Sequence, residues 1–226
     1  MSLENAKRAA GAKAAEFIEN GMIVGLGTGT TAAYFIESLI QRCKKGLKIQ
    51  GVASSRHSAD LAKKGGIQVL DINAAPRVDI TVDGADEIDP KKRMIKGGGG
   101  AHVREKILAC ASTEMVVIVD ESKLVPSIGK AKLPVEILFY GSPATRMRIE
   151  VLGYQGRWRM NPDGALFLTE NGNLIFDIQF PSPPPHPEKD HEKLIHIPGV
   201  IDTGFFFNIA GRVVVGYADG RIEVRP

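Results

Sequence analysis

Short apolar segments alternate with helical segments through the first 120 residues, and this alternation is the strongest constraint on the fold. The apolar segments are MIVGL, KIQGVAS, IQVLD, VDITVD and MVVIVD, which begin at residues 22, 48, 67, 78 and 115. Helical spacing of apolar residues is found over 3–19, 32–43, 57–64 and 101–111. Continuous apolar strands that alternate with helices are typical of a mostly parallel sheet covered on both faces. We therefore predict an α/β fold with a Rossmann-like sheet and helices on both faces.

The pattern changes after Lys132. Apolar segments at 134–140, 165–169 and 173–180 are separated by the turn sequences NPDG and ENGN, which favours antiparallel hairpins. We predict a smaller α+β domain of ferredoxin-like type over 132–206, with 1–131 and 207–226 forming the α/β domain.

One proline-rich segment, PSPPPHPEKDHEK at 181–193, interrupts the smaller domain. A short surface connection that leads into a helix is the favoured interpretation, and a motif for a partner protein is the alternative.

Charge and cysteine content narrow the classes of function. The 226 residues include 29 basic and 26 acidic side chains, interspersed, with a net charge of +3, which favours a small anionic ligand over nucleic acid. Cys43 and Cys110 lie in helical segments without a CxxC partner, so a disulfide framework or Cys-rich zinc site is not expected. The N-terminal segment is charged and rich in alanine, and no apolar stretch is long enough to cross a bilayer. We expect a cytoplasmic protein that does not enter the membrane.

The loop GLGTGTT at 25–31 follows a strand and opens a helix. Backbone N–H groups and the helix N-terminus converge there, and three threonine hydroxyls add further donors, which suits a phosphate group. A dinucleotide fingerprint is disfavoured because Thr30 takes the place of the third glycine, and no Walker lysine follows. A tight strand-to-helix turn without a ligand is the alternative.

The window DGADEID at 83–89 follows another apolar strand. Asp83 and Asp86 should therefore lie at the carboxyl edge of the sheet, where open α/β folds bind ligands. Glu87 and Asp89 are interpreted as solvated turn residues. A magnesium site is the competing interpretation, although the spacing matches no EF-hand.

The window KGGGGAHVREK at 96–106 combines bare backbone with charged groups. Four glycines permit close approach to a ligand. The ammonium of Lys96 can neutralise a developing oxyanion, and Glu105, at the start of the next helix, is either a general base or a surface carboxylate. Together with the aspartates, this set suits proton abstraction next to a carbonyl.

Seven motifs in this order resemble type A ribose-5-phosphate isomerases. They are GLGTGTT, DGADEID, KGGGGAHVREKI, VDESKLV, LPVEI, TENGN and IPGVIDTGFF. The resemblance runs from about Lys7 to the C-terminus. It implies the interconversion of D-ribose 5-phosphate and D-ribulose 5-phosphate through a cis-enediol in the pentose phosphate pathway, without a cofactor or metal, by a cytoplasmic homodimer or homotetramer.

The resemblance also implies roles for individual residues. Glu105 is the expected general base, assisted by Asp83, Asp86 and Lys96, and the aspartate that promotes ring opening is left open. The expected substrate-binding residues are Thr28, Gly29, Thr30, Thr31, Asp83, Gly84, Ala85, Asp86, Lys96, Gly97, Gly98, Gly99, Lys123 and Lys7.

Four residues depart from the usual family pattern. Thr30 stands where serine is common, Gly100 and His102 replace small and aliphatic residues, and Glu170 replaces the aspartate of TDNGN. Thr30 keeps a hydroxyl, so phosphate binding is not threatened.

Three other classes of function are alternatives. A sugar-phosphate-sensing regulator would need a helix-turn-helix, for which residues 1–21 leave room for only one helix. A CoA transferase would use a glutamate nucleophile, and a metal-dependent isomerase would lose activity to a chelator.

Overall fold

The computed structural model describes residues 2–226, which divide into two compact units. Unit 1 comprises the segment up to Ala85 together with Arg104–Leu124 and Ile209–Pro226, and unit 2 comprises Asp86–Val103 and Val125–Asn208. The segment 86–103 thus belongs to unit 2, although the sequence analysis assigned it to the α/β domain. Where an independently folding domain would begin and end stays a prediction.

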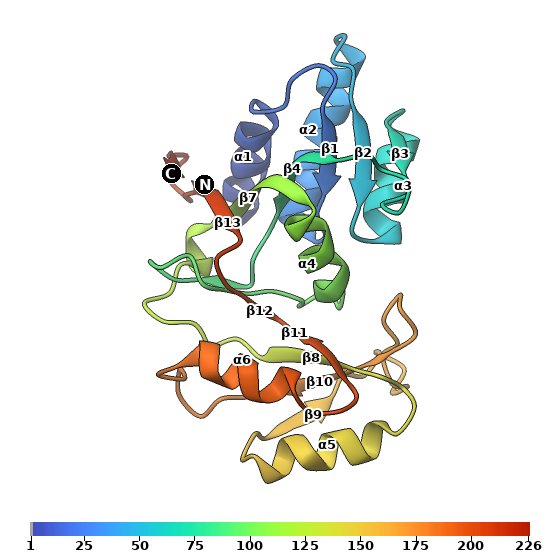
Figure 1. The fold of residues 1–226 in the computed structure, drawn as a ribbon. Coiled ribbons are helices and arrows are strands. Elements are labelled where there is room, and N and C mark those ends of the chain that lie inside the picture. The colour runs from blue at the N-terminus through green and yellow to red at the C-terminus, as the bar shows by residue number, and fades with distance from the viewer. Residues whose placement is uncertain (1) are drawn as a thin grey trace. The chain divides into compact units, whose positions relative to one another are not determined.

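A seven-stranded sheet forms the centre of unit 1 (Figure 1). The strand order is β14-β13-β7-β4-β1-β2-β3; all neighbouring pairs are parallel except β13 with β14. The strands are β1 (Ile23–Leu26), β2 (Gln50–Ala53), β3 (Gln68–Leu70), β4 (Val78–Asp83), β7 (Ser112–Asp120), β13 (Ala210–Gly216) and β14 (Ile222–Arg225). The predicted α/β fold with a mostly parallel sheet is confirmed.

Helices cover both faces of this sheet. They are α1 (Leu3–Ala15), α2 (Thr30–Lys44), α3 (Arg56–Lys64) and α4 (His102–Cys110), of which the residues from Arg104 onward belong to unit 1. Val24 and Leu26 of β1 point into the core formed with α1 and α2, whereas Ile23 points to the opposite face and packs with Leu108 of α4. The alternation of side chains along β1 therefore separates two helical layers.

Local sequence sets the helix ends and the close packing of α1. The Ser2 hydroxyl accepts a hydrogen bond from the Asn5 N–H (3.4 Å) and caps α1, and Ser55 caps α3 in the same way. Small residues line the buried side of α1, and a Cβ added to Gly11 would lie 2.7 Å from the Phe35 N of α2. Glycine at position 11 thus allows α1 and α2 to approach closely.

The connections place a topological switch point between β1 and β4. The chain runs from β1 through α2 to β2 on one side, and from β4 through α4 to β7 on the other. At such a point the loops after the two central strands diverge and leave a crevice at the carboxyl edge, which is where open α/β sheets bind ligands. The two loops are GTGTT at 27–31 and GAD at 84–86.

Unit 2 is an α+β structure, as predicted. Its four-stranded antiparallel sheet has the order β11-β8-β10-β9 and carries two helices, and a three-stranded sheet has the order β12-β6-β5. The elements are β5 (Glu87–Ile88), β6 (Met94–Ile95), β8 (Leu133–Ile137), α5 (Ser142–Val151), β9 (Gly156–Trp158), β10 (Leu174–Ile178), α6 (Pro187–Ile195), β11 (Val200–Thr203) and β12 (Phe205–Phe206).

Two details of unit 2 differ from the sequence analysis. The strand expected over 165–169 is reduced to isolated bridges from Leu166 to Met160 and from Leu168 to Leu174. The helix after the proline-rich segment begins at Pro187, within the expected connection, because proline is compatible with the first helical turn.

No helix among residues 2–226 is long and apolar enough to cross a membrane.

The pair Glu114–Arg212, which joins β7 to β13, predicts a pH-dependent contribution to stability. The guanidinium of Arg212 donates two hydrogen bonds to the carboxylate (both 2.7 Å), and these lower the pKa of Glu114 below its ordinary value of 4.5. A depressed pKa means that the stabilisation is present above the unfolded value and is lost as the pH falls through the folded value. We expect Glu114→Gln to lower the free energy of unfolding by about 1 kcal/mol or less at pH 7, because the pair is partly exposed. Urea unfolding at pH 7 and pH 3 should show the difference from wild type shrinking at the lower pH.

The matched control is Glu37→Gln, which removes an exposed ion pair with Arg8 (3.6 Å). An equal loss for Glu114→Gln at both pH values would contradict the assigned role of the carboxylate.

Candidate functional site

The loop after β1 is held against β2 and β4 by hydrogen bonds. The Gly27 N–H donates to the Val82 carbonyl (3.0 Å), and the hydroxyls of Thr28 and Ser54 share a hydrogen bond of 2.8 Å. Gly29, at φ 103°, precedes α2, and no side chain caps the helix there. Thr30 is exposed and Thr31 is half-buried. The N-terminus of α2 thus presents backbone N–H groups and hydroxyls to solvent, an arrangement that suits an anion.

Asp83 ends β4 and is almost completely buried, with 1% of its surface exposed. Its Oδ1 accepts hydrogen bonds from the Thr28 N–H (2.9 Å) and the Gly84 N–H (2.8 Å). A Cβ added to Gly27 would lie only 2.2 Å from this oxygen, so only glycine lets the carboxylate reach the loop. Asp83 therefore connects the two loops of the switch point.

Glu105 lies in the first turn of α4 and is 4% exposed. One turn later, the carbonyl of Leu108 lies 3.5 Å from the Thr81 hydroxyl, so α4 covers the face of β4 that carries Thr81. Asp83 projects from the same face, two residues further along the strand. Because α4 leads directly into β7, it runs antiparallel to the strands.

Glu105 and Asp83 lie at similar levels along the strand direction, as helix and strand geometry show. From the level of Thr81 and Leu108, Glu105 lies about 4.5 Å further toward the carboxyl edge, at 1.5 Å per helical residue. Asp83 lies about 6.6 Å further in the same direction, at 3.3 Å per strand residue. Unit 1 thus places both buried carboxylates on one sheet face near the carboxyl edge.

Lys7 and Lys123 belong to the same edge of the sheet. The Asp120 side chain accepts a hydrogen bond from the Ser122 N–H (2.9 Å), which turns the chain at the end of β7 and leads to Lys123. A Cβ on Gly216, the last residue of β13, would lie 2.0 Å from the Ala6 carbonyl oxygen, so the first turn of α1 packs on that strand end. Lys7 follows in the same turn. Both lysines are half-buried.

The glycine run belongs to unit 2. The Gly98 N–H donates to Asp86 Oδ2 (2.8 Å), and the Gly100 N–H donates to the Gly97 carbonyl (2.9 Å). Gly97 and Gly100 have φ values of 102° and 82°, which residues with a Cβ rarely adopt. The run is therefore a defined turn, and Asp86 is part of it.

Lys96 begins the turn and is 3% exposed. Its N–H donates to the Gly204 carbonyl (2.9 Å), and its ammonium lies 5.4 Å from the centre of the Phe206 ring. Phe205 and Phe206 are buried, as expected for core residues. A cation over an aromatic face is stabilised by the ring, so the charge is tolerated in a site shielded from water.

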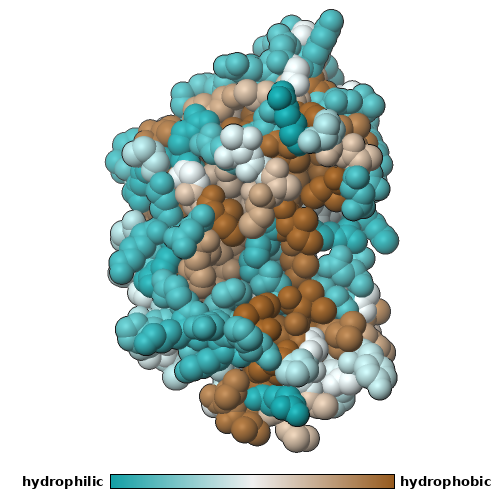
Figure 2. Space-filling model, viewed as in Figure 1, coloured by the Kyte–Doolittle hydropathy of each residue, from teal (hydrophilic) through white to brown (hydrophobic). Residues whose placement is uncertain are grey.

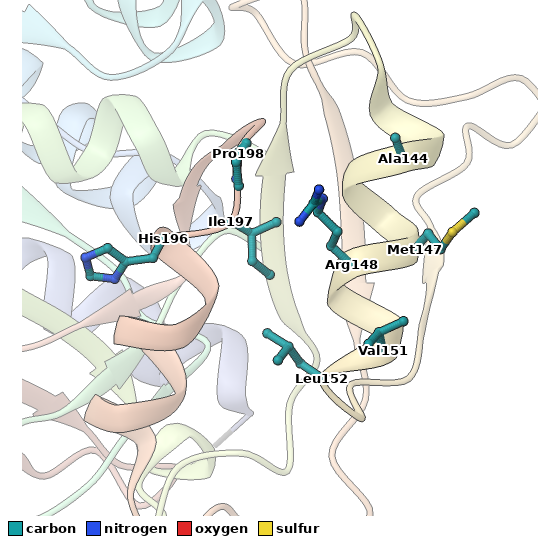
Figure 3. A pocket seen from close by; sticks show the side chains of 8 residues that line it. All are labelled: Ala144, Met147, Arg148, Val151, Leu152, His196, Ile197 and Pro198. Carbon is teal, nitrogen blue, oxygen red and sulfur yellow. The ribbon is translucent and has the colours of Figure 1, made fainter.

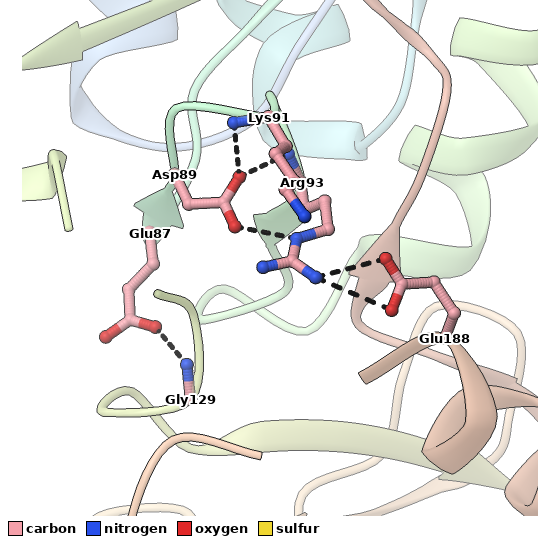
Figure 4. Close-up of polar contacts among 6 residues, drawn as sticks. All are labelled: Glu87, Asp89, Lys91, Arg93, Gly129 and Glu188. Carbon is pink, nitrogen blue, oxygen red and sulfur yellow. Dashed lines mark hydrogen bonds and ion pairs between the residues drawn. The ribbon is translucent and has the colours of Figure 1, made fainter. Parts of the chain in front are cut away.

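The interpretation of Glu87 and Asp89 as solvated residues is wrong. Glu87 is 4% exposed and accepts hydrogen bonds from the N–H groups of Gly129 (2.6 Å) and Ala131 (2.7 Å). Asp89 is 5% exposed and accepts from the Arg93 side chain, which also bonds Glu188 (Figure 4). Burial acts to lower the pKa of Arg93, but both carboxylates outweigh it and raise the pKa. These acids organise unit 2 and are not part of the candidate site.

Three contributors to these segments were missed from sequence. Ser54 and Ser58 are buried, and the Ser58 hydroxyl donates to the Gly27 carbonyl (2.5 Å). Arg159 donates to the carbonyls of Gly97 (2.8 Å) and Gly98 (3.1 Å). Each is far in sequence from the residue it holds, so the motifs alone do not reveal it.

An apolar cavity of about 590 Å³ lies elsewhere in unit 2 (Figure 3). It is lined by α5 and by the segment that follows α6, and it holds none of the predicted site residues; the lining side chains are Ala144, Met147, Arg148, Val151, Leu152, His196, Ile197 and Pro198. With one guanidinium and largely aliphatic walls, it lacks the hydroxyls and carboxylates that a sugar phosphate needs.

Within residues 2–226, no three His, Cys, Asp or Glu side chains are grouped so that they could hold a metal ion. A site without a metal stays a prediction, which a chelator tests.

The profile of one protein family matches most of this sequence. The family is described as ribose 5-phosphate isomerase A, also called phosphoriboisomerase A, and the match covers residues 50–220. The chain belongs to this family. Its members interconvert ribose 5-phosphate and ribulose 5-phosphate.

Curated relatives support the family assignment over nearly the full length. Ribose-5-phosphate isomerase A of Protochlamydia amoebophila is 49% identical over 219 residues, which is 97% of this chain and 94% of the relative. The enzyme of Bacillus mycoides is 43% identical and covers 96% of this chain and 97% of its own.

Solved structures of family members share the fold. A D-ribose-5-phosphate isomerase in complex with phospho-erythronic acid superposes with a TM-score of 0.94 at 36% identity, over 100% of this chain and 99% of that one. The enzyme of Methanocaldococcus jannaschii gives a TM-score of 0.92 at 33% identity and covers 99% of both chains. The resemblance inferred from the seven motifs is confirmed.

The contact between Gly27 and Asp83 predicts a cost for any side chain at position 27. We expect Gly27→Ala to lower the free energy of unfolding by about 1–3 kcal/mol, because the added methyl group overlaps the buried carboxylate. Equilibrium unfolding in urea measures this loss. The matched control is Gly84→Ala, where the nearest atom to the added Cβ is 3.7 Å away and little change is expected. Equal stability of both variants would show that Asp83 does not need this close approach.

Proposed function

We propose that this protein is a ribose-5-phosphate isomerase that interconverts D-ribose 5-phosphate and D-ribulose 5-phosphate through a cis-enediol or enediolate. The observation that carries the proposal is a pair of buried carboxylates, Glu105 and Asp83, on one face of the sheet beside the threonine loop. Membership of the family supports the choice of substrate. The proposal also assigns the protein to the non-oxidative pentose phosphate pathway.

Thr28, Gly29, Thr30 and Thr31 are proposed to hold the phosphate. Hydroxyls and backbone N–H groups at the start of α2 are suited to a dianion, and the helix dipole favours negative charge there. Lys123 and, more weakly, Lys7 are proposed to add positive charge at the same edge. Binding a group remote from the reacting carbons supplies energy that orients C1 and C2.

Glu105 is proposed to move the proton. In the open-chain aldehyde, its carboxylate removes the proton from C2, the released electron pair forms the C1=C2 bond, and the aldehyde oxygen takes the negative charge. Transfer of the C2 hydroxyl proton to O1 and return of the abstracted proton from Glu105 to C1 then give the ketone with its C1 hydroxyl. Low exposure of Glu105 favours return of the proton to the substrate over its loss to water.

Lys96 and the glycine run are proposed to stabilise the enediolate. The ammonium of Lys96 and the N–H groups of Gly97 and Gly99 are the proposed donors, and each oxyanion donor is typically worth about 3 kcal/mol. Gly98 is proposed to contact the substrate as part of the same turn, since its N–H bonds Asp86. Asp83 and Asp86 are proposed to orient substrate hydroxyls with Gly84 and Ala85, and one of the two aspartates assists ring opening. Phospho-erythronic acid, bound in a related structure, carries a planar carboxylate that resembles the enediolate.

A cytoplasmic location is proposed from the two cysteines that form no disulfide, Cys43 and Cys110. Burial raises the pKa of the Cys43 thiol, which disfavours its reactive thiolate form.

The proposed activity is tested by measuring ribulose 5-phosphate formed from ribose 5-phosphate. We expect wild-type protein to be active before and after exhaustive EDTA treatment, and Glu105→Gln to lower kcat by about 10²- to 10⁴-fold, the usual contribution of a positioned general base. Circular dichroism and phospho-erythronic acid binding should show that the variant is folded.

The matched control is Glu192→Gln, an exposed glutamate of α6 that should keep full activity. Near-normal turnover by folded Glu105→Gln would refute the assignment of the base. Loss of wild-type activity to EDTA would favour a metal-dependent isomerase, and acyl exchange would favour a CoA transferase.

A homodimer or homotetramer is proposed from the apolar surface of unit 2 around α5 (Figure 2). Met147 is 65%, Val151 81% and Tyr140 87% exposed, more than a monomer needs to leave in water. We expect Met147→Glu combined with Val151→Glu to lower the mass measured by light scattering after gel filtration. Arg157→Glu, at an exposed polar position, is the control. If the mass of the double variant were unchanged, α5 would not be part of the interface. A monomeric wild-type protein would refute the proposed oligomer.

A further inference from the structure

Arg159 lies outside the recognised motifs, and its side chain holds the glycine run. It follows β9 directly, and only 16% of its side chain is exposed. One terminal nitrogen donates to the carbonyls of Gly97 (2.8 Å) and Gly98 (3.1 Å), about 60 residues earlier in the chain. Two successive peptide groups of the run are therefore fixed by one guanidinium.

Because the peptide bond is planar, a hydrogen bond that fixes a carbonyl also fixes the direction of the N–H group in the same peptide. In a trans peptide the carbonyl and the next N–H point in opposite directions. The peptide between Gly97 and Gly98 is held at both ends, since its carbonyl accepts from Arg159 and its N–H donates to Asp86 Oδ2 (2.8 Å). The second contact of Arg159, to the Gly98 carbonyl, turns the Gly99 N–H away from the guanidinium.

Asp177 fixes the guanidinium itself. Its two carboxylate oxygens accept hydrogen bonds from Arg159 Nε (2.9 Å) and Nη2 (2.5 Å), in the planar paired geometry that only arginine offers. The guanidinium carbon also lies 5.8 Å from the centre of the Phe167 ring, and the same ring would contact a Cβ on Gly100 at 2.5 Å. Arginine, ring and glycine run form one packed assembly.

We propose that Arg159, held by Asp177, is a positioning residue that directs the N–H group of Gly99 for stabilisation of the enediolate. This inference rests on the proposed function, because it assumes that the glycine run meets the reacting carbons. Flexible glycines alone would leave these peptides free to flip, so the run needs an external restraint. Arg159 supplies it from the carbonyl side, and the Gly99 N–H then points to the opposite side.

The test compares steady-state kinetics of Arg159→Met, Asp177→Asn and the matched control Arg157→Met. Arg157 is two residues earlier, pairs with Asp177 in the strand register and is exposed. The concentration of binding-competent active sites is measured by calorimetric titration with phospho-erythronic acid, so that kcat is expressed per site. We expect kcat per site to fall about 10- to 100-fold in Arg159→Met, the range for a catalytic group displaced by about 1 Å. KM should change by less than about threefold, since interactions made only in the transition state affect kcat. Arg157→Met should match wild type.

Two further measurements separate positioning from a general structural role. The double variant of Arg159→Met with Asp177→Asn should lose no more activity than Arg159→Met alone, because Asp177 acts through the arginine. In Arg159→Ala, millimolar guanidinium should restore part of kcat, since Arg159 and Asp177 line an open cavity of about 690 Å³ through which it can enter. Sodium at the same concentration should not.

Wild-type kcat per site in Arg159→Met, or an equal loss in Arg157→Met, would overturn the proposal. If Arg159→Met fails to fold, Arg159→Lys replaces it, and full kcat in that variant would also overturn the proposal, since lysine cannot hold both carbonyls and Asp177 in one plane. A wild-type protein that forms no ribulose 5-phosphate would instead refute the proposed function.

Discussion

The hydrogen bonds of Asp83 are the constraint on which the carboxyl edge of the unit 1 sheet depends. One buried oxygen accepts the N–H groups of Thr28 and Gly84, so it joins the loop after β1 to the loop after β4. Burying a carboxylate is costly unless donors compensate, and these two backbone groups do so. Position 27 is a glycine because the Asp83 carboxylate occupies the space that a larger side chain would need. The threonine loop and the acidic turn are therefore directly linked, although Thr28 and Asp83 lie 55 residues apart in the sequence.

The sequence predicted those parts of the site that are local in the chain. The strand, the threonine loop and the helix after it lie within one window, and an apolar strand that ends in Asp83 marks the sheet edge by itself. Residue type and spacing leave Glu105 as either a base or a surface carboxylate, and the family motifs favour the base, which stays a prediction. The structure adds burial, which the sequence could not provide.

What the sequence could not predict depends on partners distant in the chain. Glu87 and Asp89 have the composition of a solvated turn, yet Glu87 is buried because Gly129 and Ala131 bring N–H donors from more than 40 residues away. Arg159 lies in the short window RWRM, which carries no recognisable signal. Its importance follows only from the fold of unit 2, which brings it to the glycine carbonyls. The residues that form a turn lie next to one another in the sequence, whereas the donors that compensate a buried charge can come from any part of the fold.

The sheet of unit 1 also bears on how the chain folds during synthesis. Strands β13 and β14 come from the last 17 residues, after the whole of unit 2, and β13 pairs with β7. Until they emerge from the ribosome, β7 is an open edge whose residues from Val116 to Val119 are fully apolar. Such an edge, with parallel partners far apart in sequence, favours slow folding and exposes the nascent chain to aggregation. Pairing of β13 with β7 is thus the step that completes the sheet of unit 1.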